Sequence, residues 1–286
     1  MTMQPGATAL RAAVGAPEPV TWIDAGGTLL AAMRRGTGAP VLCLHAIGHG
    51  ARDFEALASR IGKDFEVIAL DWPAQGRSPH DGVAPDAAHY AALIGPAMDA
   101  LGLESAILLG NSIGGAAALR FAADHPARVR ALVVCNAGGL AAPSALTRFL
   151  IGRFAAFFRA GETGKRWFGR AFRLYYSRVL REKPARAQRV RIVASAYEIA
   201  RPLRQAWESF ARPEADARAL VPRIGCPVWL AWAKDDSIIP WSGTKAAAAR
   251  FADARVAMFR GGHAAFLEDP DRFAAGFVAF AKPLLQ

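Results

Sequence analysis

Ser112 is the residue of this sequence whose setting most clearly predicts catalysis. It stands at the centre of a G-x-S-x-G pattern at 110–114, directly after a short apolar run and directly before a helical pattern. A sharp turn from strand to helix exposes a serine hydroxyl, and the flanking glycines leave room for the neighbouring chain. We therefore predict that Ser112 is a nucleophile at a helix N-terminus, where free N–H groups favour developing negative charge.

A serine hydroxyl becomes nucleophilic when a base takes its proton and a third group holds that base in the right tautomer. His263 follows the last predicted strand, and Asp235 and Asp236 follow the strand predicted at 228–233. Loops at the carboxyl ends of parallel strands meet at one edge of a sheet, where ligand sites form. The sequence therefore predicts a catalytic triad with His263 as general base and one of the two aspartates as the orienting acid.

Short apolar runs that alternate with longer helical patterns must position these residues. Such an alternation predicts an α/β fold, in which a mostly parallel sheet carries helices on both faces. The expected strands are 20–23, 29–33, 41–44, 65–70, 106–109, 129–135, 228–233 and 255–259. The expected helices are 52–60, 86–101, 113–124, 242–251 and 270–284.

The alternation stops at 140–223, where no strand is predicted and Arg, Phe, Tyr and Trp recur at helical spacing. We expect a helical cap inserted after the sixth strand, so that 20–139 and 224–286 form the core. Residues 1–19 predict a loose tail. The cap holds 18 Lys and Arg against 6 Asp and Glu, and the rest of the chain 17 against 18. The net charge of +11 therefore belongs to the cap.

Two further motifs resemble the α/β-hydrolase family, in the capped bacterial type that is similar to esterases and carbon–carbon bond hydrolases. The sequence LHAIG at 44–48 is similar to the family's His-Gly-x loop, and DWPAQGRS at 71–78 is similar to its mainly structural Asp-x-x-x-x-Gly-x-Ser loop. The resemblance covers nearly all of the chain beyond residue 20. It implies the α/β-hydrolase fold, in which the triad follows the chain order Ser, Asp, His.

The resemblance also assigns the remaining site residues. It implies that the backbone N–H groups of Ile47 and Ile113 form the oxyanion hole. In the family the acid commonly lies four residues before a proline. Asp236 lies four residues before Pro240 and is therefore assigned as the acid, with Asp235 as the alternative. Ala46 replaces the glycine that is usual after the first histidine. Because alanine disfavours positive φ, we expect this loop to turn without positive φ at that position.

The other polar candidates are assigned structural roles. His45 and His49 share a loop, but neither a glutamate nor a third histidine stands nearby, so no metal is expected. We expect His45 to brace the oxyanion loop, Asp71 to brace the loop that it begins, and His89 to face solvent. No cofactor is expected either.

The predicted reaction is acyl transfer to water, with a carboxylic ester as the preferred substrate. A carbon–carbon bond hydrolase acting on ring-cleavage products is the main alternative, because GNSIGG and the later NAGG at 136–139 resemble that subgroup. A cofactor-free haloperoxidase-like enzyme would use the same triad. The resemblance argues against dehalogenases and epoxide hydrolases, whose nucleophile is an aspartate. A non-catalytic ligand receptor fits an intact triad least well.

The cap composition bears on substrate and partners. We expect its apolar face to roof a pocket for a small apolar or amphipathic substrate, with the arginine charges in water. The alternative is that these charges attract an anionic substrate or a membrane surface. No nucleic-acid partner is expected. The sequence has three cysteines, Cys43, Cys135 and Cys226, whose spacing does not suit metal binding, and we expect them to be buried thiols. Together with the lack of a secretory signal pattern, they predict a cytoplasmic location.

Overall fold

One eight-stranded sheet forms the centre of the molecule, in a computed structural model that describes residues 20–141 and 144–285. The predicted tail at 1–19 lies outside the described residues. The strands are β1 (Thr21–Asp24), β2 (Leu29–Arg35), β3 (Ala39–Leu44), β4 (Phe65–Asp71), β5 (Ala106–Asn111), β6 (Val129–Cys135), β7 (Val228–Ala233) and β8 (Ala254–Phe259). All eight expected strands are present, with ends that differ by up to two residues.

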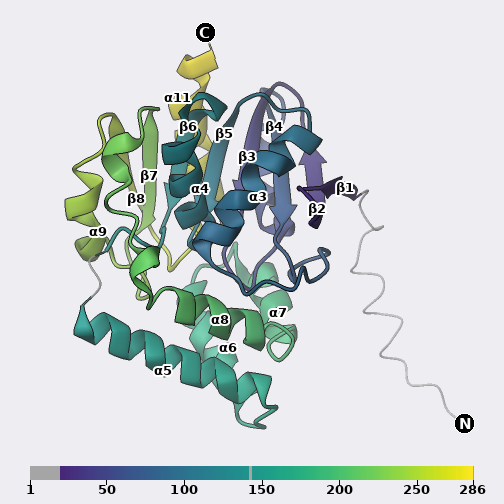
Figure 1. Cartoon of the computed structure of the whole chain (residues 1–286), viewed down its shortest axis with the longest axis vertical. Helices are drawn as coiled ribbons and strands as arrows, with labels where there is room; N and C mark the ends of the chain where they lie inside the picture. The colour runs from purple at the N-terminus through teal and green to yellow at the C-terminus, as the bar shows by residue number, and fades with distance from the viewer. Residues whose placement is uncertain (1–19, 142–143, 286) are drawn as a thin grey trace, which may run out of the picture.

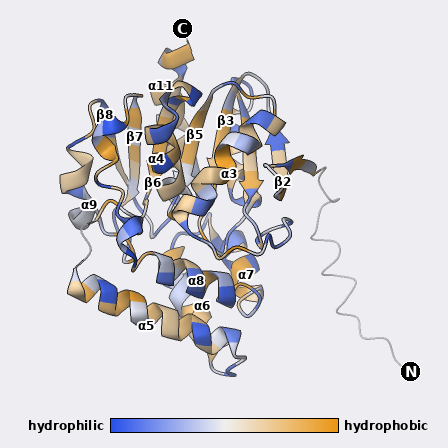
Figure 2. Cartoon of the chain, in the orientation of Figure 1, coloured by the Kyte–Doolittle hydropathy of each residue, from blue (hydrophilic) through white to orange (hydrophobic). Residues whose placement is uncertain are grey.

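The sheet order is β1-β2-β4-β3-β5-β6-β7-β8. β1 and β2 pair antiparallel with their neighbours, and every pair from β4 to β8 is parallel. All residues of β5 and β7 are buried, as expected for central parallel strands covered on both faces. Figure 2 shows hydrophobic residues concentrated along these strands. The predicted α/β-hydrolase architecture, with a mostly parallel sheet between helices, is confirmed.

Helices cover both faces of the sheet (Figure 1). α3 packs against α4, and α2 packs against α11. The expected helix at 52–60 begins as a 3-10 turn before α2, and the expected last helix ends in another 3-10 turn. The Asp86 carboxylate caps α3 by accepting from the His89 N–H at 2.7 Å. The helices that flank the sheet are α2 (Glu55–Ile61), α3 (Ala87–Ala100), α4 (Ile113–Asp124), α9 (Trp241–Ala248), α10 (Ala265–Glu268) and α11 (Pro270–Ala281).

Among the described residues, four α-helices lie between β6 and β7 in the chain, and Figure 1 shows them together at one end of the sheet. They are α5 (Ala145–Glu162), α6 (Phe168–Val179), α7 (Arg186–Ala194) and α8 (Ala200–Ser209). Within 144–223 the structure contains no strand. α5 packs along α8, and both helices carry hydrophobic and hydrophilic sides (Figure 2). No described helix combines the length and the apolar character that crossing a membrane requires.

Candidate active site

Ser112 occupies the turn between β5 and α4 in a conformation that serine rarely adopts, with φ 56° and ψ −117°. The turn is tight because both flanking glycines touch backbone. A Cβ on Gly110 would lie 2.5 Å from the Gly114 carbonyl oxygen, and one on Gly114 would lie 2.3 Å from the Leu44 carbonyl oxygen. Side chains at either position would collide with the chain. The strained turn therefore depends on this glycine pattern, and it places Ser112 directly before the first residue of α4.

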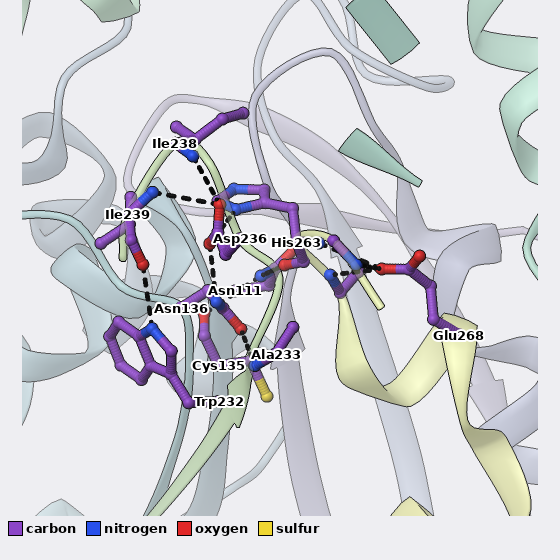
Figure 3. A network of polar contacts seen from close by, with 12 residues as sticks. Asn111, Cys135, Asn136, Trp232, Ala233, Asp236, Ile238, Ile239, His263 and Glu268 are labelled. Carbon is purple, nitrogen blue, oxygen red and sulfur yellow. Dashed lines mark hydrogen bonds and ion pairs between the residues drawn. The ribbon is translucent and has the colours of Figure 1, made fainter. Parts of the chain in front are cut away.

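His263 and Asp236 form a buried pair on the loops that follow β8 and β7. The imidazole Nδ1 lies 2.8 Å from Oδ2 of the carboxylate, as Figure 3 shows. Oδ2 also accepts from the Asn136 amide at 2.6 Å, and Oδ1 accepts from the N–H groups of Ile238 and Ile239 at 2.7 and 3.1 Å. Four donors thus fix the carboxylate. It in turn fixes the ring, so that Nε2 is the nitrogen left to react.

Asp235 is exposed, and the contact with His263 is made by Asp236. We therefore expect Asp236→Asn to lower kcat by about 10⁴-fold, because an amide that donates toward Nδ1 favours the wrong tautomer of the ring. Asp235→Asn, the matched control one residue away, should change kcat less than about threefold. Steady-state kinetics on an aryl ester would measure both. The opposite ranking would assign the role to Asp235.

The environment of His263 raises the pKa of its imidazole above the usual value. Burial alone would lower the pKa, but the negative charge of Asp236 and its hydrogen bond outweigh burial, and Glu268 adds a further attraction for the proton. The ring is therefore a stronger base than a histidine in water. This is the property required of a group that removes a proton from a serine hydroxyl.

Ser112 and His263 line the same cavity, which has a volume of about 450 Å³. No hydrogen bond joins their side chains among the residues that the structure describes. In enzymes without substrate such bonds are often long, and they tighten when substrate is bound. The walls of the cavity are mainly apolar. The inserted helices contribute to them the side chains of Ile151, Phe154, Tyr175, Tyr176, Leu203 and Trp207.

The predicted oxyanion donors lie at the start of α4 and on the loop after β3. Ile113 is the first residue of α4, and Ile47 lines the cavity on the loop after β3. Neither backbone N–H donates to another group within 20–141 and 144–285. Ala46 has no positive φ, as expected; the loop turns at Gly48 instead, with φ 76°. Both N–H groups are thus available to a negative oxygen beside Ser112.

His45 braces the loop after β3, as predicted, through contacts with Trp72. The His45 Nε2 accepts from the Trp72 N–H at 3.0 Å, and the indole N–H of the same residue donates to the His45 carbonyl at 3.0 Å. Gln75 accepts from the Gly48 N–H at 2.6 Å. Asp71 braces its own loop by accepting from the Ala51 and Arg77 N–H groups. His89 was expected to face solvent, but its side chain is only 18% exposed and lies 2.7 Å from the Asp81 carboxylate.

Two residues of the site were not predicted. Asn136 has φ 43°, and its side chain both donates to Asp236 and accepts from the Ala233 N–H at 3.0 Å. Asn111 donates to the carbonyl oxygens of His263 and Cys135 at 2.9 and 3.0 Å. For Asn136 the available signal was an asparagine directly after a buried strand, because asparagine tolerates positive φ and pairs with backbone. Both residues tie the loops of the proposed triad to the ends of β5 and β6.

Glu268 is the third residue that sequence reasoning missed. Its buried carboxylate faces the His263 loop (Figure 3), where Oε2 accepts from the N–H groups of Gly262, His263 and Ala264 at 2.7, 3.0 and 3.3 Å. Oε1 accepts from two N–H groups of the inserted segment, at Arg181 and Glu182. One carboxylate therefore shapes the loop of the proposed base and joins it to the segment between α6 and α7.

The described residues contain no group of three histidines, cysteines or carboxylates that could hold a metal ion. Cys43, Cys135 and Cys226 are free thiols. The first two are buried as predicted, and Cys226 is only partly buried.

A sequence model described as the alpha/beta hydrolase fold matches residues 39–270, most of the chain. The chain therefore belongs to the α/β-hydrolase family, and it is an enzyme of the α/β-hydrolase type.

Three similar proteins illustrate the range of this family. A putative non-heme haloperoxidase of Mycobacterium phage D29 is 29% identical over 86% of this chain and 88% of its own length. A 2-hydroxy-6-oxo-6-phenylhexa-2,4-dienoate hydrolase of Comamonas testosteroni is 38% identical, over 37% of this chain and 39% of that enzyme. The solved structure of an esterase from Exiguobacterium antarcticum has a TM-score of 0.79 at 20% identity, covering 92% of this chain and 99% of the esterase. The last likeness concerns the fold alone.

Proposed function

We propose that this protein is a serine hydrolase that cleaves a carboxylic ester through an acyl-enzyme. The observation that carries the proposal is the buried Asp236–His263 pair, joined at 2.8 Å, with His263 on the wall of the cavity that Ser112 also lines. A base polarised by a buried carboxylate beside a serine on a strained turn is the arrangement that activates a hydroxyl group.

In the proposed reaction, Ser112 Oγ attacks the ester carbonyl carbon while its proton passes to His263 Nε2. The N–H groups of Ile47 and Ile113 stabilise the oxyanion. The carbon–oxygen bond of the ester then breaks, and the leaving alkoxide takes the proton from His263, which leaves the acyl group on Ser112. Water attacks this acyl-enzyme with His263 again as base, the bond to Ser112 Oγ breaks, His263 returns the proton to that oxygen, and the acid is released. Asp236 stabilises the imidazolium at both stages without taking the proton.

A carbon–carbon bond hydrolase is the second candidate, supported by the 38% identity with the dienoate hydrolase. The same triad would also serve a haloperoxidase-like enzyme, in line with the phage relative. The apolar cavity of about 450 Å³ favours a small apolar or amphipathic substrate in each case.

An activity screen separates the two leading candidates. We expect kcat/KM for aryl esters of short and medium chain length to exceed that for ring-cleavage dienones by at least about tenfold, because the wall of the cavity is mainly apolar. Release of the aryl alcohol and loss of dienone absorbance are the measurements. Turnover of dienones with no measurable ester cleavage would favour the carbon–carbon bond hydrolase.

We also propose that 140–223 acts as a cap, because the side chains of α5, α6 and α8 supply much of the cavity wall. Its outer surface is basic and partly apolar: Leu146 and Phe149 on α5 are 66% and 64% exposed. Such a surface suits an anionic substrate or a membrane surface as partner. The free cysteines support the cytoplasm as the compartment.

The partner proposal predicts a dependence on ionic strength. We expect sedimentation with anionic vesicles at low salt that is lost at high salt, because exposed charges are screened within about 10 Å at 0.1 M salt. Replacing the exposed Arg170, Arg173 and Arg178 of α6 by glutamine should weaken sedimentation. Replacing Lys63 and Lys245, which are exposed on the core, by glutamine should leave sedimentation unchanged. If vesicles are not bound and salt affects neutral and anionic esters equally, the cap charges are only a solvated face.

A further inference from the structure

A second buried histidine–aspartate pair borders the cavity of the proposed active site. His49 Nδ1 lies 2.5 Å from Asp53 Oδ2, and both side chains are buried from solvent, with exposures of 1% and 0%. The two residues belong to the loop after β3 and the 3-10 turn that follows it. The proposed triad does not use either of them.

The pair is completed by the inserted helices. The Gln188 side chain, on α7, donates to the other carboxylate oxygen of Asp53. The Tyr176 ring, on α6, lies 6.0 Å from the His49 ring, centroid to centroid. Burying a carboxylate and an imidazole is costly unless they are paired, and apolar residues could fill such a space at lower cost. A buried polar network beside a ligand cavity is therefore a candidate for a functional role.

His49 is one of the residues that line the cavity shared by Ser112 and His263, and it also lines a second cavity of about 340 Å³. Within 20–141 and 144–285, its Nε2 has no hydrogen-bond partner. The carboxylate of Asp53 only accepts hydrogen bonds, so the proton on Nδ1 is fixed there. In the neutral ring, Nε2 then carries a lone pair and serves as an acceptor.

We propose that His49 is a specificity-determining residue, whose Nε2 accepts a hydrogen bond from a hydroxyl group of the substrate. The inference rests on the proposed ester hydrolysis at Ser112, and it assigns the substrate to the class of hydroxylated esters. Asp53 is a positioning residue that acts through the His49 tautomer. The mainly apolar wall of the same cavity contacts the rest of the substrate.

The test compares three series of aryl esters of short alkanoic acids: unsubstituted, with a hydroxyl at successive carbons, and with a methoxy group at the same carbons. Methoxy groups accept hydrogen bonds but do not donate them. For at least one position, the wild-type protein should show a kcat/KM for the hydroxy ester at least about tenfold above that for its methoxy partner. Comparing the hydroxy ester with the methoxy ester at one position separates the effect of a donated hydrogen bond from the effect of a polar substituent.

Three variants test the assignment. His49→Phe should remove the preference in kcat/KM for the hydroxy over the methoxy ester, because the phenyl ring keeps the approximate shape of the imidazole and lacks Nε2. Asp53→Asn should reduce or invert the ratio, because an amide no longer fixes the proton on Nδ1 and Nε2 becomes a donor. His89→Phe is the matched control, since His89 pairs with Asp81 at 2.7 Å but does not line the cavity. That variant should keep the wild-type ratio.

The outcomes separate this inference from the proposed function. If wild-type protein cleaves esters but does not distinguish hydroxy from methoxy compounds at any position, the role of His49 is wrong and the proposed hydrolysis stands. A ratio that survives both His49→Phe and Asp53→Asn also rules it out. If no ester is cleaved and a fluorophosphonate probe does not label Ser112, the proposed function itself fails. Loss of the ratio in both variants, with retention in His89→Phe, supports the assignment.

Discussion

Ser112→Ala is expected to abolish covalent labelling by a fluorophosphonate probe and to lower kcat for ester hydrolysis by about 10⁶-fold. The reason is that these probes react with base-activated serines, and the carbonyl attack has no other nucleophile on the turn between β5 and α4. Intact-protein mass spectrometry measures the added phosphonyl group, and burst kinetics measure acyl-enzyme formation.

Ser237→Ala provides the control for the labelling experiment, because Ser237 lines the same cavity without standing at a helix N-terminus. Labelling of this variant should match the wild type. Undiminished labelling of Ser112→Ala would remove Ser112 from the mechanism, and transfer of the label to another residue would identify the true nucleophile by peptide mapping.

His263→Ala should lower kcat by a similar factor, because the nucleophile and its base act as a unit. The combination Ser112→Ala with His263→Ala should then be scarcely slower than either single variant. Steady-state kinetics of the three proteins measure this non-additivity. Independent, multiplying losses would show that the two side chains do not share one proton-transfer step.

The pH profile of the wild-type protein checks the same base in another way. The pKa of His263 lies above its usual value of about 6.5, and only the neutral ring can accept the serine proton. As pH falls through that raised pKa, the ring is protonated and kcat/KM should decline. The midpoint of the acid limb is therefore expected above about 6.5. A midpoint well below that value would contradict the effect of Asp236.

The sequence predicted the sheet because central parallel strands are buried on both faces and appear as short apolar runs. It predicted the inserted helices because apolar and basic residues recur there at helical spacing. It did not predict where α7 and α8 meet the core. That placement depends on side-chain packing between segments far apart in the chain, which periodicity does not record.

For the site, the locally encoded parts were predictable. The turn at Ser112 and the four-residue offset between Asp236 and Pro240 are short patterns within one loop. The contacts of Glu268 and Asn136 could not be found this way, because each depends on which loops the sheet order brings together. The same holds for His49, which the sequence pairs by spacing with His45, whereas the fold pairs it with Asp53.

The carboxylate of Glu268 has a mechanical consequence. It accepts hydrogen bonds from two separate segments: from three N–H groups of the loop that carries His263, and from two N–H groups of the link between α6 and α7. If that link moved away from the core, the Oε1 oxygen of the buried carboxylate would lose its two donors. The Glu268 side chain would then be held less firmly against the histidine loop. Opening of this link would therefore weaken the support of the proposed base, His263. The end of α5 that follows β6 carries no such tether to the histidine loop in the described part of the chain.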